Sequence, residues 1–191
     1  MMKAGFPPQG RRAFPRFWTP LLAIALLLAV TAPRQPALAA PELDERGLHI
    51  QPWFLSSFMD LAEDRAQAQA AGKRLILLWE LKGCPYCKLL HEVTLADPEV
   101  RAFMQENFET LQLDLRGPLE VTDFDGEQMG ERALGRKYNI RLTPTLQFFP
   151  LDGEDLSGVA PKEREIFRMP GYMEPADFMQ VLQDVARGRY D

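Results

Sequence analysis

Apolar residues recur along this chain with periods that distinguish helices from strands. Helical spacing predicts helices over three stretches: 57–71, 129–138 and 174–187. Strand patterns occupy four others: 75–81, 110–115, 145–149 and 164–169. The first of these, LILLWEL, is apolar on both faces for most of its length. Such a run is typical of a central strand that helices cover on both sides.

Local signals mark the ends of these elements. Ser56 or Ser57 is available to cap the first helix, and Gly72 to stop it. The stretch 85–107 predicts two helical pieces or one broken helix, because Asp97 can cap a second segment that has a proline at its first position.

The order of the elements predicts an α/β fold. Strands separated by helices imply parallel pairing through right-handed crossovers, whereas the short Asp152-Gly153 link implies an antiparallel hairpin. Residues 116–128 are expected to form a loop or a short acidic insertion. A mixed central β-sheet flanked by helices on both faces follows, with 55–191 as one domain.

The first 39 residues carry the three-part pattern of a secretory signal peptide. Basic residues up to Arg16 precede an apolar run of ten residues at 21–30, and Ala37-Leu38-Ala39 offers a cleavage point. A membrane-spanning helix needs about 20 apolar residues, so cleavage is favoured over an uncleaved anchor. We expect export to the periplasm; Arg11-Arg12 leaves the twin-arginine route open beside the general secretory one.

The net charge of the chain argues against two classes of binding partner. The net charge is −5, and residues 1–39 hold five basic and no acidic residues, so the remainder carries −10. An acidic body argues against binding nucleic acid or an anionic membrane. We also expect the protein to be a monomer. Residues 40–54 are polar and interrupted by prolines, which indicates an N-terminal arm with order beginning near Trp53.

Two cysteines in an oxidising compartment indicate disulfide chemistry. Cys84-Pro85-Tyr86-Cys87 lies where a buried strand passes into a helix. Unpaired N–H groups and the helix dipole there favour a thiolate at Cys84, which makes Cys84 the nucleophile. Pro85 suits the first helical position, and Cys87, nearly one turn on, becomes the resolving thiol.

Two other interpretations of the cysteines stay open. A static disulfide that closes so short a loop adds little stability, and so explains the position poorly. A zinc site needs four ligands, and His91 is the nearby candidate in a chain with 2 cysteines, so we expect no metal. His91 is interpreted as a surface residue or one that supports the site from behind.

The CPYC motif, together with Thr143-Pro144-Thr145 further along the chain, resembles the thioredoxin fold over roughly residues 55–188. The resemblance implies that Pro144 is a cis-proline facing the cysteines and that Thr143 offers its backbone to an extended substrate. Pro85 and Tyr86 join them on the implied substrate-binding face. The implied activity is thiol-disulfide exchange, which needs no bound cofactor.

Within that family, the sequence is most similar to the periplasmic SoxW-type thioredoxins associated with sulfur oxidation. The ELKGCPYCK context, the insertion after 110–115 and Met169-Pro170-Gly171-Tyr172 carry this similarity. It implies a disulfide reductase that is kept reduced by a membrane electron transporter of the CcdA/DsbD type and acts on thiol-bearing or disulfide-bearing periplasmic proteins. Alternatives are a disulfide oxidase or isomerase, and a non-enzymatic metal-binding or thiol-binding module.

Two acidic features accompany the motif. Glu80 lies four residues before Cys84. By the resemblance, a buried acid at this place would exchange a proton with Cys87. Glu80 is not at the position of the usual thioredoxin aspartate, where this chain has Leu78. Exposure at the strand end is the alternative for Glu80. The cluster Asp123, Asp125 and Glu127 departs from a calcium loop at two positions and is interpreted as a solvated loop.

Overall fold

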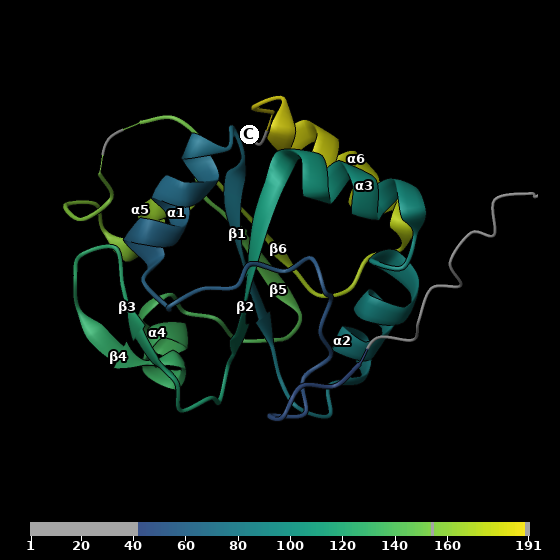
Figure 1. The fold of residues 1–191 in the computed structure, drawn as a ribbon, viewed down its shortest axis with the longest axis horizontal. Coiled ribbons are helices and arrows are strands. Elements are labelled where there is room, and N and C mark those ends of the chain that lie inside the picture. The colour runs from purple at the N-terminus through teal and green to yellow at the C-terminus, as the bar shows by residue number, and fades with distance from the viewer. Residues whose placement is uncertain (1–41, 154, 190–191) are drawn as a thin grey trace, which may run out of the picture. The chain divides into compact units, whose positions relative to one another are not determined.

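A computed structural model describes residues 42–153 and 155–189. A four-stranded sheet with the order β2-β1-β5-β6 forms the centre of this part of the chain (Figure 1). Its strands are β1 (Arg74–Glu80), β2 (Phe108–Asp114), β5 (Thr145–Phe148) and β6 (Phe167–Pro170). β1 pairs with β2 in parallel, whereas β5 is antiparallel to both β1 and β6. The predicted mixed sheet is confirmed.

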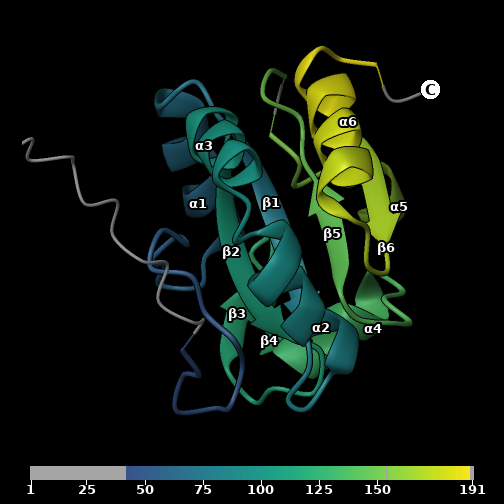
Figure 2. The same cartoon turned by 90° about the vertical axis from the view of Figure 1, so that its right-hand side faces the viewer.

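Helices cover both faces of the sheet. They are α1 (Leu61–Ala70), α2 (Pro85–Leu89), the π-helical turn η1 (Leu90–Thr94), α3 (Pro98–Asn107), α4 (Glu131–Lys137), α5 (Pro161–Arg164) and α6 (Pro175–Ala186). Figure 1 shows α1 and α4 on one side of the strands and α2, α3 and α6 on the other, and Figure 2 shows α2 and α4 near the same end of the sheet. None of the described helices is long and apolar enough to cross a membrane.

The alternation of side chains along β1 divides the core into two clusters. Leu75, Leu77 and Trp79 pack with residues of α1 and α4, while Ile76 and Leu78 pack with residues of η1, α3 and α6. The indole of Trp79 is fully buried and donates from Nε1 to Gln147 Oε1 at 2.6 Å. Burial on both faces explains why this strand reads as a continuous apolar run.

The predicted helix caps are confirmed for one helix and not for another. Asp97 caps α3 by accepting hydrogen bonds from the N–H groups of Glu99 and Val100, as predicted. The first helix, however, is capped by Asp60 rather than by a serine. Ser57 instead donates to Asp64 Oδ2 at 2.7 Å and accepts from the Met59 N–H, so its hydroxyl organises the turn before the cap.

The predicted parallel pairing is wrong for β5. Thr145, the first residue of β5, pairs with Trp79 near the end of β1, and Ile76 pairs with Phe148, so the two strands run in opposite directions. The connection through α4 leads back to the end of the sheet where β1 finishes, not to the end where it starts. This places the segment before β5 beside the residues that follow β1.

Two connections also differ from expectation. Residues 116–128 contain β3 (Glu120–Thr122) and the start of β4 (Gln128–Gly130), which form an antiparallel two-stranded sheet instead of a loop. The antiparallel pairing predicted across Asp152-Gly153 is confirmed for β5 and β6, but the link is not a tight hairpin turn, because α5 stands between the two strands. Single-sequence patterns miss three-residue strands and long connections of this kind, since both depend on tertiary contacts.

Order begins well before Trp53, contrary to the prediction for the arm. Leu43 and His49 form an antiparallel bridge around a turn in which Asp44 Oδ1 accepts from two backbone N–H groups at 2.9 Å. Leu48 is 1% exposed. Its burial against the domain is a tertiary effect that a short polar sequence does not reveal. The expected signal peptide, residues 1–39, lies outside the described residues.

Candidate active site at the Cys84–Cys87 disulfide

Cys84 and Cys87 are joined by a disulfide at the start of α2. Cys84 is the N-cap, and its Sγ accepts a hydrogen bond from the Cys87 N–H at 3.1 Å. Pro85 occupies the first helical position, as predicted. Cys84 is partly exposed, whereas Cys87 is 2% exposed. The two sulfurs therefore differ in access: only Cys84 meets an incoming substrate readily.

The segment before β5 lies against Cys84. The Thr143–Pro144 peptide bond is cis, and the Thr143 carbonyl oxygen is 3.6 Å from Cys84 Sγ. The Thr143 hydroxyl donates to the same sulfur at 3.3 Å. The antiparallel placement of β5 brings these residues together with Cys84, 59 positions apart in the chain. Sequence reasoning anticipated the backbone of Thr143 but not its hydroxyl.

Exposed apolar side chains occur in the helical stretch that carries the disulfide and directly before Thr143. Tyr86 is 60% exposed, and its ring stacks on that of Tyr172 with centroids 6.5 Å apart. Leu89 and Leu142 are also exposed. Large exposed apolar side chains that gather around a reactive group are typical of a surface that contacts another molecule.

Glu80 is buried, not exposed, at the end of β1. Its side chain is 1% exposed, and its Oε2 lies 3.0 Å from Nε2 of His91, which is itself fully buried. Gln112 Nε2 also donates to this oxygen. Glu80 Oε1, by contrast, is buried and has no hydrogen-bond partner among the described residues. His91 is therefore not a surface residue. It is buried and contacts the carboxylate of Glu80, which agrees with the other interpretation, a residue that supports the site.

The N-terminal arm completes this buried cluster. Gln51 Nε2 lies 3.3 Å from His91 Nδ1, and Gln112 Nε2 donates to the carbonyl of His49. The rings of His49 and His91 are 5.7 Å apart. If Gln51 donates to Nδ1, His91 carries its proton on Nε2 and donates it to Glu80. Gln112 was missed, although a glutamine at an inward position of TLQLDL is an available signal.

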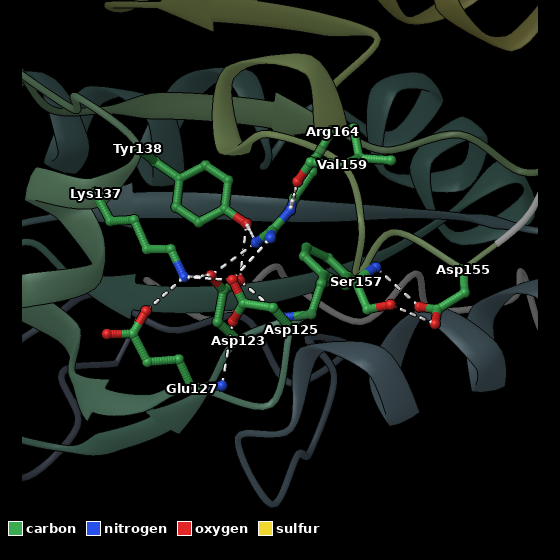
Figure 3. A network of polar contacts seen from close by, with 10 residues as sticks. Asp123, Asp125, Glu127, Lys137, Tyr138, Asp155, Ser157, Val159 and Arg164 are labelled. Carbon is green, nitrogen blue, oxygen red and sulfur yellow. Dashed lines mark hydrogen bonds and ion pairs between the residues drawn. The ribbon is translucent and has the colours of Figure 1, made fainter.

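The acidic cluster after β3 is an ion-pair network, not a solvated loop (Figure 3). Lys137 Nζ lies 2.5 Å from Asp123, 2.7 Å from Asp125 and 2.8 Å from Glu127. Arg164, 2% exposed, pairs with Asp123 and Asp125 at 2.8 Å each. An ammonium group therefore occupies the position between the three carboxylates that a cation would take in a calcium loop.

Mutual contacts set the protonation of this network. Burial alone would raise the pKa of Asp125, but hydrogen bonds from Arg164 and Lys137 outweigh it and hold the pKa well below its usual range. Burial would lower the pKa of Lys137, and its acidic partners raise it instead. Within the described ranges, no group of three or more His, Cys, Asp or Glu side chains is arranged to hold a metal ion.

Comparison with known proteins agrees with this geometry. The family model for thioredoxin-like domains matches residues 61–186. The thiol:disulfide interchange protein DsbD of Klebsiella pneumoniae is 29% identical over 175 residues, which cover 88% of this chain and 25% of that protein. DsbD of Salmonella typhi is 27% identical over 176 residues, covering 92% and 27%. The chain spans about a quarter of the length of these curated relatives.

Solved structures share the fold. A thioredoxin-fold protein from Helicobacter pylori superposes with a TM-score of 0.54 at 22% identity, over 72% of this chain and 79% of that one. A thioredoxin from Thermus thermophilus gives 0.51 at 25% identity, over 68% and 86%. The chain belongs to the family of thioredoxin-like domains. Its Cys84–Cys87 disulfide lies at the start of α2, next to the segment that precedes β5.

Proposed function

We propose that the protein is an exported disulfide reductase that takes electrons from a membrane transporter of the CcdA/DsbD type and passes them to disulfides of periplasmic proteins. The signal-like N-terminus and the similarity to proteins named for thiol:disulfide interchange support this proposal. The SoxW-type likeness makes disulfides formed during sulfur oxidation the expected substrate class. We expect a monomer that needs no cofactor besides its own cysteine pair.

The unequal exposure of the two cysteines, with Thr143 beside the more exposed one, is the observation that supports Cys84 as the attacking sulfur. The Cys84 thiolate attacks one sulfur of the substrate disulfide, forms a mixed disulfide and releases the other sulfur as a thiolate. Cys87 then loses its proton and attacks Cys84 Sγ. This closes the Cys84–Cys87 bond and releases the second substrate thiolate, so two electrons pass to the substrate.

An extended substrate segment is expected to lie along Thr143 and Pro144, with Pro85 and Tyr86 on its other side. The Thr143 carbonyl already lies near the reactive sulfur, and Tyr86 presents an exposed apolar surface next to it. Backbone pairing with such a segment tolerates many side chains, which suits an enzyme that acts on several proteins.

Glu80 is proposed to accept the proton of Cys87. Cys87 is buried, so its proton needs an acceptor inside the protein, and the Oε1 atom of Glu80 is an available one. His91 and Gln112 both contact Oε2, so the lone pairs of Oε1 remain free to accept a proton. His91 follows Cys87 by four residues on one continuous helical stretch, so both side chains project from about the same face.

The redox potential of the Cys84/Cys87 pair tests the direction of electron flow. We expect a value near that of thioredoxin, about −270 mV, measured by alkylation mass shift in glutathione or dithiothreitol buffers. Insulin reduction should require Cys84 and be lost in Cys84→Ser. A potential near about −120 mV would instead indicate an oxidase. Stoichiometric metal on a reduced protein that does not turn over would favour a binding module.

The role of Glu80 has a separate test. In Glu80→Gln, release of the second thiolate from a preformed mixed disulfide at Cys84 should slow at least tenfold at pH 7, because Cys87 has lost its proton acceptor. The initial attack by Cys84 should change less than twofold. Equal slowing of both steps, or of neither, would contradict the assignment. His91→Gln keeps an N–H donor in place and should retain more of the second step than His91→Phe.

A further inference from the structure

Three arginines converge on a surface pocket that the disulfide chemistry described above does not use. The pocket, about 460 Å³, is lined by Leu115, Arg116, Arg132, Arg136 and Ile140. Arg132 and Arg136 lie one turn apart on α4, so their side chains share a helix face. Arg132 Nη2 donates to the Arg116 carbonyl at 3.3 Å, which ties α4 to the end of β2.

These guanidinium groups lack the acidic partners that the cations of the ion-pair network have. Lys137, Arg164 and Arg168 each pair with a carboxylate within 3.0 Å. Arg116, Arg132 and Arg136 form no ion pair with any residue that the structure describes, and all three side chains are exposed.

The nearest acids along the chain are engaged elsewhere. Asp114 Oδ1 accepts from the Arg116 backbone N–H, and Glu131 accepts from the Asp114 N–H and from Arg46. Three unpaired positive charges around one pocket therefore stand out in a body that carries −10 from residue 40 onward. Their mutual repulsion is relieved when an anion enters.

The pocket lies at the same end of the sheet as the cysteines. Leu115 follows β2 directly and donates its N–H to the carbonyl of Glu80. Ile140 precedes Thr143 by three residues, so the pocket wall is within about 11 Å of chain from the carbonyl that faces Cys84. Figure 2 shows α4 and α2 near this same end.

We propose that this arginine pocket binds a carboxylate or oxoanion group carried by the disulfide substrate, next to the sulfur that Cys84 attacks. Guanidinium forks match the planar geometry of carboxylates and the oxygens of sulfur oxoanions. Leu115 and Ile140 add apolar contact surface to the same pocket. The inference rests on the proposed function, because it assigns a substrate class to the same site.

The test compares an anionic and a neutral aromatic disulfide, 5,5′-dithiobis(2-nitrobenzoate) and 4,4′-dithiodipyridine, as substrates of the reduced full-length protein. In R132Q/R136Q, the rate constant with the dicarboxylate should fall about tenfold, while that with the neutral disulfide changes less than twofold. R132K/R136K keeps the charges but loses the guanidinium forks, and its rate with the dicarboxylate should lie between those of wild type and R132Q/R136Q. Raising the ionic strength should slow wild type with the dicarboxylate and affect R132Q/R136Q less.

R101Q/R187Q is the matched control. It removes the same charge from α3 and from the end of α6, which Figure 1 places at the other end of the sheet from α4, and should leave the ratio of the two rates unchanged. An unchanged ratio in R132Q/R136Q, or an equal change in R101Q/R187Q, would overturn the inference. Failure of wild type to reduce either disulfide would instead contradict the proposed function.

Two peptide disulfides that differ only in Glu or Gln beside the cysteine identify the source of the anion. Preference for the Glu peptide, lost in R132Q/R136Q, supports a protein-borne carboxylate. Preference for the small dicarboxylate without a peptide preference supports a small-molecule disulfide. Both outcomes agree with the inference, because in both the arginine pocket binds an anionic group of the disulfide substrate.

Discussion

Thr143 contributes its side chain as well as its backbone to the site. In the disulfide form the hydroxyl donates to Cys84 Sγ at 3.3 Å. After reduction the same donor faces the Cys84 thiolate, and a hydrogen bond to a charged group is worth about 1.5 kcal/mol or more. In Thr143→Val, we therefore expect the midpoint of the pH profile of Cys84 alkylation to rise by about one pH unit. Thr143→Ser keeps the donor and should follow wild type; a coincident profile for the valine variant would remove the hydroxyl from the mechanism.

Asp64 makes stability depend on pH. Burial raises its pKa to about 6, despite the hydrogen bond from Ser57. Between pH 4 and pH 6 the folded state then binds more protons than the unfolded state, so the free energy of unfolding falls as pH rises and stays low above that window.

Asp64→Asn should remove this slope and stabilise the protein at pH 7 by about 1–2 kcal/mol, allowing for solvent screening. Urea unfolding at several pH values between 4 and 7 measures the difference between variant and wild type. Parallel profiles would contradict the assignment.

At the scale of elements, the Lys137–Arg164 network holds three pieces of chain together. Asp123 follows β3, Lys137 ends α4 and Arg164 ends α5 (Figure 3). In Arg164→Met, the fully buried Asp123 loses a charged partner, which should cost about 3–5 kcal/mol in urea unfolding.

Lys162→Met is the control for this variant. Lys162 is 83% exposed and its contact with Glu163 is 3.8 Å long, so its removal should change stability by less than about 0.5 kcal/mol. A similar loss in both variants would show that general charge, and not the network, is responsible.

The elements also show where local patterns succeed and fail. β1 was predictable because burial on both faces leaves a continuous apolar run, and α3 because Asp97 and Pro98 form a cap that acts within one turn. The hairpin of β3 and β4 was not, because strands of three residues carry too little periodicity to separate from a loop.

At the scale of the whole molecule, the arm belongs to the same folded unit as the domain. Leu48 is 1% exposed, so Leu48→Ala should cost about 2–4 kcal/mol, with a single unfolding transition. Leu43 is 59% exposed, and Leu43→Ala should be nearly neutral. Two separate transitions, or a neutral Leu48 variant, would show that the arm folds independently.

The arm also lies outside the matched stretch 61–186, yet it supplies Gln51 and His49 to the cluster around Glu80. In Gln51→Ala we expect the second step of the exchange reaction to slow about threefold, since His91 loses the donor that orients it. Gln69→Ala removes a similar half-buried amide that bonds to Leu151, and should leave that step unchanged.

The sequence by itself determined the redox pair, its position at the start of a helix and the proline beside it, because these depend on spacing and on backbone groups within one turn. Only the tertiary structure decided the direction of β5, which brings Thr143 to Cys84, and the burial of Glu80 against His91 and Gln112. Likewise, only the fold placed an ammonium group among three acids and three arginines around one pocket. The physical reason is the same in each case. Burial and charge pairing depend on residues that are distant in the chain, and the local spacing of residues does not predict which distant residues will meet.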